Sequence, residues 1–336
     1  MRQIQKSTRW FLAGAALGAL ALASGCSNKG DEAKAPTKAP DTAGAPAAAS
    51  GGAKPTIGVS LLTNTNPFFI DMGEAMKAEG QKHNFDIVLE SGDMDAAKQR
   101  DQVKDFIVKK VSAIVLSPCD SKAVGTTIQE ANKAGIPVFT ADIASLSKDA
   151  MVISHVATDN YEGGKLAATA IVEAIGGKGK VAIIDHPEVE SCIQRTKGFR
   201  EVLAAHKDIE IVATLPGHGE RDASFKTAQD ILEKYPQLDA FFCINDPTAL
   251  GAVAAIEKAG RSGKVKVIGF DGMLEAKQAV KDGKIYADIV QFPDKIGELT
   301  IQGIASFMGG EKLKPQTLIP AAIYKKADAD KDPKVK

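Results

Sequence analysis

Hydrophobic and polar positions alternate between two patterns from residue 56 onward. Short runs rich in valine and isoleucine, typical of buried strands, are separated by longer amphipathic stretches with apolar residues at helical spacing. Two of these stretches read "FIDMGEAMKAEGQKH" and "AAKQRDQVKDFIVKK". The strand-like runs lie at 56–62, 86–91, 112–118, 136–142, 151–159, 180–185, 209–216, 238–246, 265–271 and 286–293. This alternation predicts βαβ units and parallel sheets.

The second half of the pattern is a degenerate copy of the first. Each copy has a strand, an acidic residue, a helix of small residues ending in Ala-Gly, and a strand that closes on an aspartate, Asp142 or Asp271. We therefore expect an α/β fold with two similar doubly wound parallel-sheet lobes and a ligand cleft between them. Ligands of such sheets bind beyond the carboxyl ends of the strands, and each of the two aspartates falls there.

The first 54 residues lie outside this pattern. A basic start precedes "WFLAGAALGALALA", an apolar run of signal-peptide length that is shorter than a membrane span. The letters "ASGC" then lead to Cys26 in the manner of a bacterial lipoprotein cleavage site. We expect a lipoprotein signal peptide at 1–25, lipidation at Cys26 and a disordered Ala/Pro/Gly linker at 26–54. The open alternative is a plain secretory signal with an incidental cysteine.

Composition narrows the function classes. The 42 basic and 42 acidic residues balance without a basic block, so nothing indicates nucleic acid. The sequence shows no phosphate-binding glycine motif and no metal spacing among its five histidines, so no cofactor or metal is predicted. No nucleophile and base can be recognised, and we do not expect an enzyme. Cys119, Cys192 and Cys243 are expected to be buried thiols, although one disulfide remains open.

The segment "TNTNPFF" at 63–69 leaves the first strand and begins a helix. Asn66 suits the N-cap and Pro67 the first helical position. Phe68 is left facing the strand ends, where its ring suits the apolar C–H face of a sugar. Phe69 shares a helical face with core positions, so its role stays open between ligand contact and core.

Polar residues at other strand ends fit the same kind of ligand. The carboxylates of Asp142 and Asp271 accept hydrogen bonds from sugar hydroxyls, and Arg195 donates them. Asn245 and Gln291 supply amides that both donate and accept. The remaining polar residues at strand ends are expected to cap helices (Asp120 and Asp246) or to lie at the hinge (Asp159 and Asn160).

These segments together resemble the pentose- and hexose-binding periplasmic proteins of ABC importers, and most of all their ribose-binding members (periplasmic binding proteins of type I). The matching stretches include "NPFF", "SHVATDN", "GFDG", "AVKDGK" and "VQFPDKIG". The resemblance implies two lobes, joined by three crossovers, that close over a sugar. Carried over by position, it implies ligand contacts at Asn66, Phe68, Phe69, Asp142, Arg195, Asn245, Asp271 and Gln291. The expected lobes are 55–157 with 292–318 and 158–291 with 319–328, followed by a flexible tail at 329–336.

Two positions depart from the ribose binders of that family. Ile143 stands where they have an arginine, and Gly219 stands where they have a third aromatic ring. We expect these changes to alter which hydroxyls are bound and to leave extra volume. A different pentose, a ketohexose or a sugar alcohol is therefore as good a candidate as ribose.

The expected function is that of an exported, monomeric lipoprotein that captures a monosaccharide or polyol and delivers it to the permease subunits of an ABC importer. It would be anchored to the membrane facing the periplasm, or the cell exterior where there is no outer membrane. The alternative is a ligand receptor for a membrane sensor or chemoreceptor, with a sugar or a furanose-like autoinducer as ligand.

Overall fold

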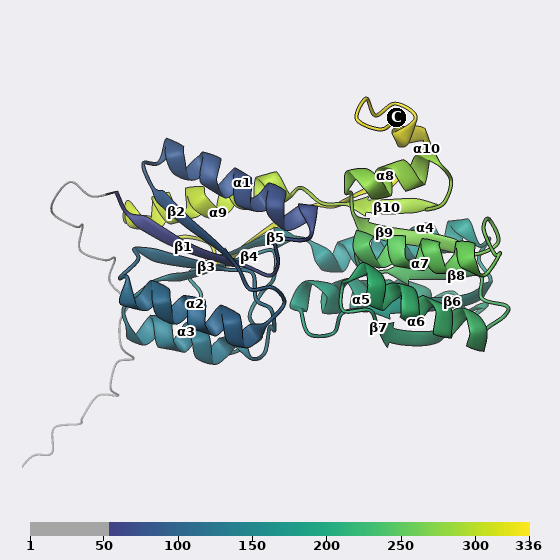
Figure 1. Ribbon diagram of the computed structural model, residues 1–336, viewed down its shortest axis with the longest axis horizontal. Coiled ribbons are helices and arrows are strands. Elements are labelled where there is room, and N and C mark those ends of the chain that lie inside the picture. The colour runs from purple at the N-terminus through teal and green to yellow at the C-terminus, as the bar shows by residue number, and fades with distance from the viewer. Residues whose placement is uncertain (1–53) are drawn as a thin grey trace, which may run out of the picture. The chain divides into compact units, whose positions relative to one another are not determined.

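Each of the two lobes is built around one six-stranded sheet (Figure 1). The computed structural model describes residues 54–336. The first sheet contains β1 (Thr56–Leu61), β2 (Asp86–Ser91), β3 (Ala113–Leu116), β4 (Val138–Ala141), β5 (His155–Thr158) and β11 (Gln316–Ile319). The second contains β6 (Gly179–Asp185), β7 (Ile209–Pro216), β8 (Ala240–Cys243), β9 (Lys266–Asp271), β10 (Ala287–Val290) and β12 (Ala322–Lys325).

The two sheets repeat one strand order. It runs β2-β1-β3-β4-β5-β11 in the first and β7-β6-β8-β9-β10-β12 in the second, and only β12 pairs antiparallel with its neighbour. The first five strands of each sheet thus follow the doubly wound 2-1-3-4-5 order. The predicted α/β class and the duplication are confirmed. The strands β11 and β12 were not predicted, because each is only four residues long, and β11 is largely exposed.

Helices cover both faces of the first sheet. The pair α1 (Pro67–Lys82) and α9 (Pro293–Met308) packs on one face, and α2 (Ala96–Val108) with α3 (Val124–Lys133) packs on the other. Met72 and Met76 are fully buried one helical turn apart on α1, where they join Ile301 of α9. Phe106 of α2 and Ile128 of α3 form the core of the opposite face. The 3.6-residue spacing of these apolar positions explains why the segments form helices.

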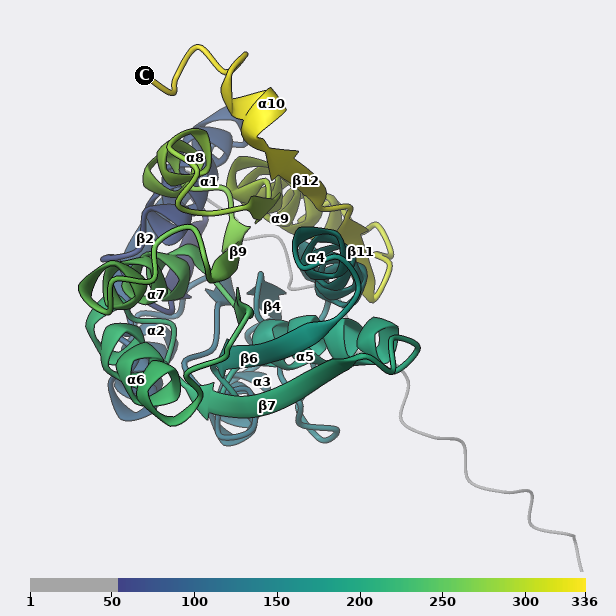
Figure 2. The ribbon, with the colours of Figure 1, turned by 90° about the vertical axis from the view of Figure 1, so that its right-hand side faces the viewer.

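The second sheet is covered in the same way (Figure 2). One face carries α4 (Asn160–Ala174) and α5 (Glu190–Leu203), and the other carries α6 (Arg221–Lys234), α7 (Asp246–Lys258) and α8 (Leu274–Lys281). Phe199 of α5 stacks on Phe242 of β8 with ring centroids 4.4 Å apart. A short helix, α10 (Lys326–Ala329), follows β12.

The chain passes between the sheets three times: from β5 to α4, from β10 to α9, and from β11 to β12. The three-crossover connection implied by the sequence is therefore confirmed. At the first crossover, Asp159 caps α4 by accepting a hydrogen bond from the Glu162 backbone N–H at 3.1 Å. The residue limits expected for the lobes stay predictions.

The last residues of the chain contact α8. Val335 is buried, its carbonyl accepts a hydrogen bond from Lys281 Nζ at 3.1 Å, and the Lys336 N–H donates to Gln278 Oε1 at 3.0 Å. The sequence predicted a flexible tail at 329–336, whereas these bonds join its end to the second lobe.

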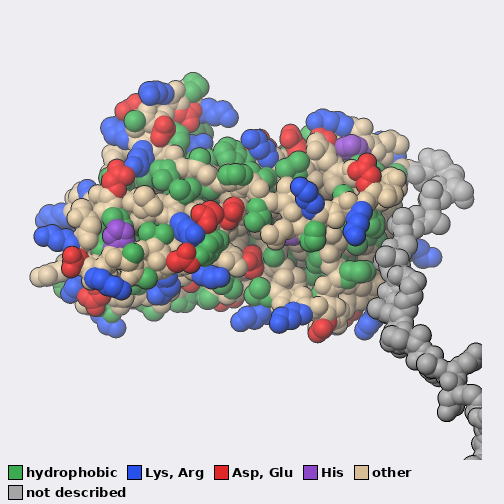
Figure 3. All heavy atoms as spheres, turned by 180° about the vertical axis from the view of Figure 1, so that it is seen from behind, with side chains coloured by type: hydrophobic (Ala, Val, Ile, Leu, Met, Phe, Trp, Pro, Cys, Tyr) green, Lys and Arg blue, Asp and Glu red, His purple; other side chains and the backbone are tan. Residues whose placement is uncertain are grey.

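The signal peptide expected at 1–25, the lipidation expected at Cys26 and nearly all of the expected linker lie outside the described residues. Within residues 54–336, no helix combines the length and apolar character needed to cross a membrane. Acidic and basic side chains are interspersed over the face that Figure 3 shows, in keeping with the balanced charge of the sequence.

Candidate ligand-binding cleft

Side chains from the carboxyl ends of both sheets converge on one small cavity of about 30 Å³. Each of the eight predicted ligand residues lines it and is at most 9% exposed. They are Asn66, Phe68, Phe69, Asp142, Arg195, Asn245, Asp271 and Gln291. The fold thus brings together the residues that the sequence singled out, and their contact with a ligand stays a prediction.

The start of α1 forms an aromatic wall of the cavity. Asn66 is the N-cap, because its side-chain oxygen accepts a hydrogen bond from the Phe68 N–H at 2.9 Å, and Pro67 occupies the first helical turn. The rings of Phe68 and Phe69 meet edge to face with centroids 5.2 Å apart. Both rings belong to the hydrophobic core and line the cavity as well. Phe69 can therefore belong to the core and contact a ligand at the same time.

The two strand-end aspartates have backbones in sparsely populated conformations. Asp142 has φ = 64° and Asp271 has φ = 128°, values that non-glycine residues seldom adopt. At Asp142 the chain turns tightly, with the Ile143 N–H donating to the Ala141 carbonyl at 2.7 Å. Strain of this kind costs of order 1–3 kcal/mol and is concentrated at functional sites. This strain occurs at matching positions of both lobes, and both positions line the cavity, which indicates a functional role for the cavity.

Arg195 lies buried on α5 and its guanidinium is fixed from several sides. Its Nε donates to Asn160 Oδ1 at 2.8 Å, and its Nη1 donates to the Ile244 carbonyl at 2.7 Å and faces Asp271 Oδ1 at 3.4 Å. The guanidinium carbon lies 3.9 Å from the centre of the Phe270 ring. Asn160, expected at the hinge, thus also orients the arginine.

Asn245, one of the two amide residues, has a structural role at the start of α7. Asn245 caps α7 through the Thr248 N–H at 3.0 Å, and its Nδ2 donates to the Gly219 carbonyl at 3.1 Å. The expectation that Asp246 caps this helix is wrong, since Asp246 lies one residue inside it and accepts from the Gly272 and Met273 N–H groups instead. Asp120 does accept from two N–H groups at the turn before α3, as expected of a cap.

Two acceptor oxygens in the cavity have no hydrogen-bond partner within residues 54–336: Asp142 Oδ1 and Gln291 Oε1. Gln291 Nε2 is used, donating to Asp271 Oδ1 at 2.7 Å. Burial raises the pKa of Asp142 to about 7 and that of Asp271 to about 6, against the opposing effect of the Arg195 charge. A buried acceptor without a donor costs about 1–3 kcal/mol, so this arrangement favours a ligand that brings donors.

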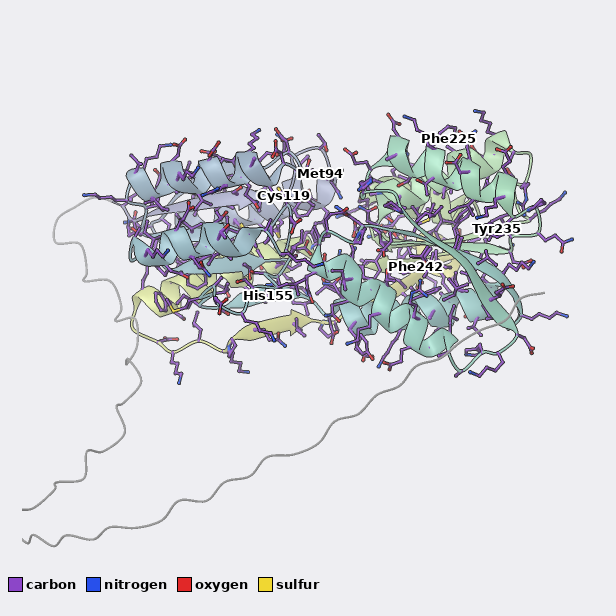
Figure 4. The ribbon with its side chains drawn as sticks, turned by 90° about the horizontal axis from the view of Figure 1, so that it is seen from below. Met94, Cys119, His155, Phe225, Tyr235 and Phe242 are labelled. Carbon is purple, nitrogen blue, oxygen red and sulfur yellow. The ribbon has the colours of Figure 1, made fainter. Side chains whose placement is uncertain are left out.

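Further residues line the cavity that sequence reasoning did not assign to it, among them Met94, His186 and Cys192. Met94 lies at the end of the first lobe that faces the second (Figure 4). His186 directly follows β6, and this position at a strand end is the signal that could have identified it. Burial lowers the pKa of His186 to about 4, so its ring is neutral near pH 7 and can both donate and accept.

The two departures from the ribose binders have different outcomes. Ile143 is 1% exposed and lines the cavity, so an apolar side chain does replace a charged one there. Gly219 lines a neighbouring hollow of about 520 Å³ together with Asn66 and Met94, and the extra volume expected for the ligand there stays a prediction. A Cβ at this position, where φ is +69°, would lie 3.1 Å from both His186 Nδ1 and Asn245 Nδ2. The His186 and Asn245 side chains therefore fill the space on that side of Gly219.

The three cysteines within residues 54–336 are free and buried, which settles the disulfide question for that part of the chain. Burial raises the pKa values of Cys119 and Cys192 to about 12, so both stay protonated and weakly reactive near neutral pH. A separate, larger hollow lies between α7, the start of β9 and the end of α8, lined by residues such as Val253, Lys284 and Tyr286. It contains none of the unpartnered acceptors described above.

Comparison with known proteins gives consistent matches over the two lobes. Residues 57–312 match the model of the periplasmic binding protein domain. The ribose import binding protein RbsB of Salmonella typhimurium is 35% identical over 263 residues, which cover 78% of this chain and 88% of that protein.

Two solved structures are also similar. One is a periplasmic solute-binding protein of an ABC transporter from Actinobacillus succinogenes with bound D-allose, with a TM-score of 0.77, 31% identity and coverage of 83% of this chain and 100% of that one. The other is a solute-binding protein from Agrobacterium vitis bound with α-D-tagatopyranose, with a TM-score of 0.80, 27% identity and coverage of 84% and 98%. This chain therefore belongs to the periplasmic binding protein family, among the solute-binding proteins of sugar ABC transporters.

Proposed function

We propose that this protein captures a single neutral monosaccharide or polyol between its two lobes and delivers it to an ABC importer. The observation that carries the proposal is the pair of buried acceptors, Asp142 Oδ1 and Gln291 Oε1, which have no donor among the described residues. They lie in a cavity that also holds the Phe68 ring and the Arg195 guanidinium. A sugar ring supplies both an apolar face and several hydroxyl donors.

Each lobe supplies one part of the ligand contacts. The first lobe supplies Asn66, Phe68, Phe69 and Asp142, and the second supplies Arg195, Asn245, Asp271 and Gln291. A ligand that touches both sets can do so only when the lobes are closed, and this difference in affinity favours closure. The closed form then presents surfaces of both lobes together to the permease.

The lining of the cavity limits the kind of sugar. Ile143 cannot donate a hydrogen bond, and Leu62 and Met94 add further apolar surface on the first-lobe side. A pentose, a ketohexose or a sugar alcohol with its hydroxyls toward Asp142, Arg195 and Gln291 fits this distribution. A charged ligand fits less well, because the buried carboxylates and the arginine already oppose one another.

The proposal is tested by calorimetric titration of the purified protein with a panel of pentoses, hexoses, ketoses, sugar alcohols and inositols. We expect one of these compounds to bind with a stoichiometry of one. The Asp271→Ala variant should bind it more weakly by roughly 2–3 kcal/mol, because its buried partners lose their hydrogen bonds. If every neutral sugar and polyol fails to bind, the proposed function is wrong.

We further propose that the protein acts outside the cytoplasm, tethered to a membrane by lipid on Cys26. The support is the "ASGC" pattern after an apolar segment of signal-peptide length, followed by 28 linker residues from 27 to 54. Several acyl chains on one cysteine anchor a protein stably, whereas one chain does not.

A further inference from the structure

One serine of the first lobe makes two hydrogen bonds to the backbone of the second lobe. Ser121 lies between β3 and α3, and it is fully buried. Its N–H donates to the Glu188 carbonyl at 3.0 Å, and its Oγ accepts a hydrogen bond from the Glu190 N–H at 2.9 Å. Both partners belong to the loop and helix that follow β6, so the two bonds join the lobes directly.

The second of these bonds caps a helix. Glu190 is the first residue of α5, and the residue at the N-cap position is Val189, whose side chain has no oxygen and makes no capping bond. Other helices that carry or adjoin the site supply their own caps, namely Asn66 for α1, Asp159 for α4 and Asn245 for α7. Helix α5 instead receives a hydroxyl from the opposite lobe.

The capped end of α5 is part of the cavity wall. Ser191, Cys192 and Arg195 on its first two turns line the cavity. Val189 lies between the two residues that Ser121 binds, is 1% exposed and also lines the cavity. Separating the lobes would break both bonds and leave the first N–H groups of α5 without this acceptor.

We propose that Ser121 is a positioning residue that completes the N-terminus of α5 only when the lobes are closed, and that it thereby slows release of the bound ligand. This inference rests on the proposed function. The hydroxyl is free for this role, because the bond that Ser121 makes within its own lobe, from the Leu146 N–H at 2.7 Å, uses its carbonyl oxygen. Ser121 makes no contact with the ligand itself and acts through α5 and Val189.

The test compares Ser121→Ala with Ser121→Thr, which keeps a capping hydroxyl, and with Ser145→Ala. Ser145 accepts a hydrogen bond from the Ser147 N–H within the first lobe and serves as the matched control. Because Ser121→Ala removes this N-cap, we expect it to raise the dissociation constant of the sugar about tenfold. Stopped-flow measurements should assign this change to the dissociation rate, with the association rate little changed.

The conservative Ser121→Thr and the control Ser145→Ala should bind as the wild type does, and the ligand-free melting temperature should be the same in all four proteins. A dissociation constant of Ser121→Ala within twofold of the wild type would overturn the inference. So would an equal loss of affinity in Ser121→Ala and Ser121→Thr.

Hydrogen exchange of the Glu190 amide in the sugar-bound, closed protein provides a second readout. We expect faster exchange at Glu190 in Ser121→Ala than in the wild type and normal exchange in Ser121→Thr. Equal protection in wild type and Ser121→Ala would show that the hydroxyl does not cap α5. If the wild type binds no sugar, the proposed function fails; if it binds one and the exchange rates in wild type and Ser121→Ala are equal, only the role of Ser121 is refuted.

Discussion

Arg195 shows how a single residue of the site is held in place by the protein alone. Three acceptors and the face of an aromatic ring surround its guanidinium, and the residue is buried. The fork of the guanidinium has fixed geometry, so these contacts orient its remaining N–H groups before a ligand binds. The sequence identified Arg195 as a donor, but its partner Asn160 comes from a distant part of the chain and was assigned only to the hinge.

Replacing Arg195 by lysine keeps the charge and removes the planar fork. We expect Arg195→Lys to weaken sugar binding by about 2–3 kcal/mol, because a lysine cannot reach the Asn160, Ile244 and Asp271 acceptors together. Calorimetric titration measures the effect. Arg200→Ala removes an exposed arginine from the same helix and should leave affinity unchanged. Equal affinities of Arg195→Lys and the wild type would contradict the assigned role.

Asp288 carries a buried carboxyl group that does not line the ligand cavity. Both of its oxygens, and Asp246 Oδ1, lack hydrogen-bond partners among residues 54–336 in their ionised form. A Cβ on Gly269 would lie 2.9 Å from Asp246 Oδ1 and 3.1 Å from Asp288 Oδ1, so the two carboxyl groups adjoin the same point of β9. Burial, with the nearby Asp271 charge, raises the pKa of Asp288 to about 7, and the pKa of Asp246 is also raised.

This arrangement predicts a pH-dependent stability. The folded protein keeps a proton on Asp288 that the unfolded chain loses near pH 4, so the free energy of unfolding falls as pH rises from about 4 through 7. Asp288→Asn should remove this loss, which amounts to about 2–4 kcal/mol. Denaturant titrations at pH 5 and pH 8 measure it. The exposed Asp230→Asn should keep the wild-type slope; the same slope in Asp288→Asn would refute the assignment.

At the scale of elements, close helix packing positions the site. Helices α4 and α5 approach each other through two glycines, since a Cβ on Gly164 would lie 2.0 Å from the Arg195 carbonyl oxygen and one on Gly198 would lie 2.0 Å from that of Tyr161. This contact sets the distance of α5, and thus of Arg195, from the rest of the lobe. The sequence predicted both helices, but helical periodicity does not report how closely two helices approach.

We expect Gly198→Ala to force the two helices apart and to lower the free energy of unfolding by about 1–3 kcal/mol. It should also weaken sugar binding, because Arg195 moves with α5. Gly303→Ala in α9 is the matched control: its Cβ would meet only Leu313 at 3.6 Å, so it should be neutral or stabilise by up to about 1 kcal/mol. Thermal unfolding of both variants decides between these results, and a stable Gly198→Ala protein would contradict the packing argument.

At the scale of the whole molecule, the duplicated pattern was sufficient to predict two similar lobes, and it places Asp142 and Asp271 at matching strand ends of the two sheets. Asp142 and Asp271 each lie at the end of a strongly hydrophobic strand, and parallel strands place such positions at the same edge of a sheet. The pattern could not predict β11 and β12, which are only four residues long each. It also could not predict Ser121 as a contact between lobes, because that role depends on how the lobes meet.

The membrane anchor proposed at Cys26 is tested on the whole chain. We expect Cys26→Ser to move the protein from the membrane fraction to the soluble fraction, since it removes the site of lipid attachment. Cell fractionation followed by immunodetection measures the change, and Cys119→Ser serves as a control that keeps the anchor. Retention of Cys26→Ser at the membrane would contradict lipidation at this residue.

A crystal structure of the protein with the sugar found by titration would show whether the ligand lies where we propose. We expect the sugar in the cavity between the lobes, with one ring face against Phe68 and hydroxyls donating to Asp142 Oδ1 and Gln291 Oε1. A sugar bound instead in the hollow beside α7 and α8, with both acceptors still unpartnered, would contradict it.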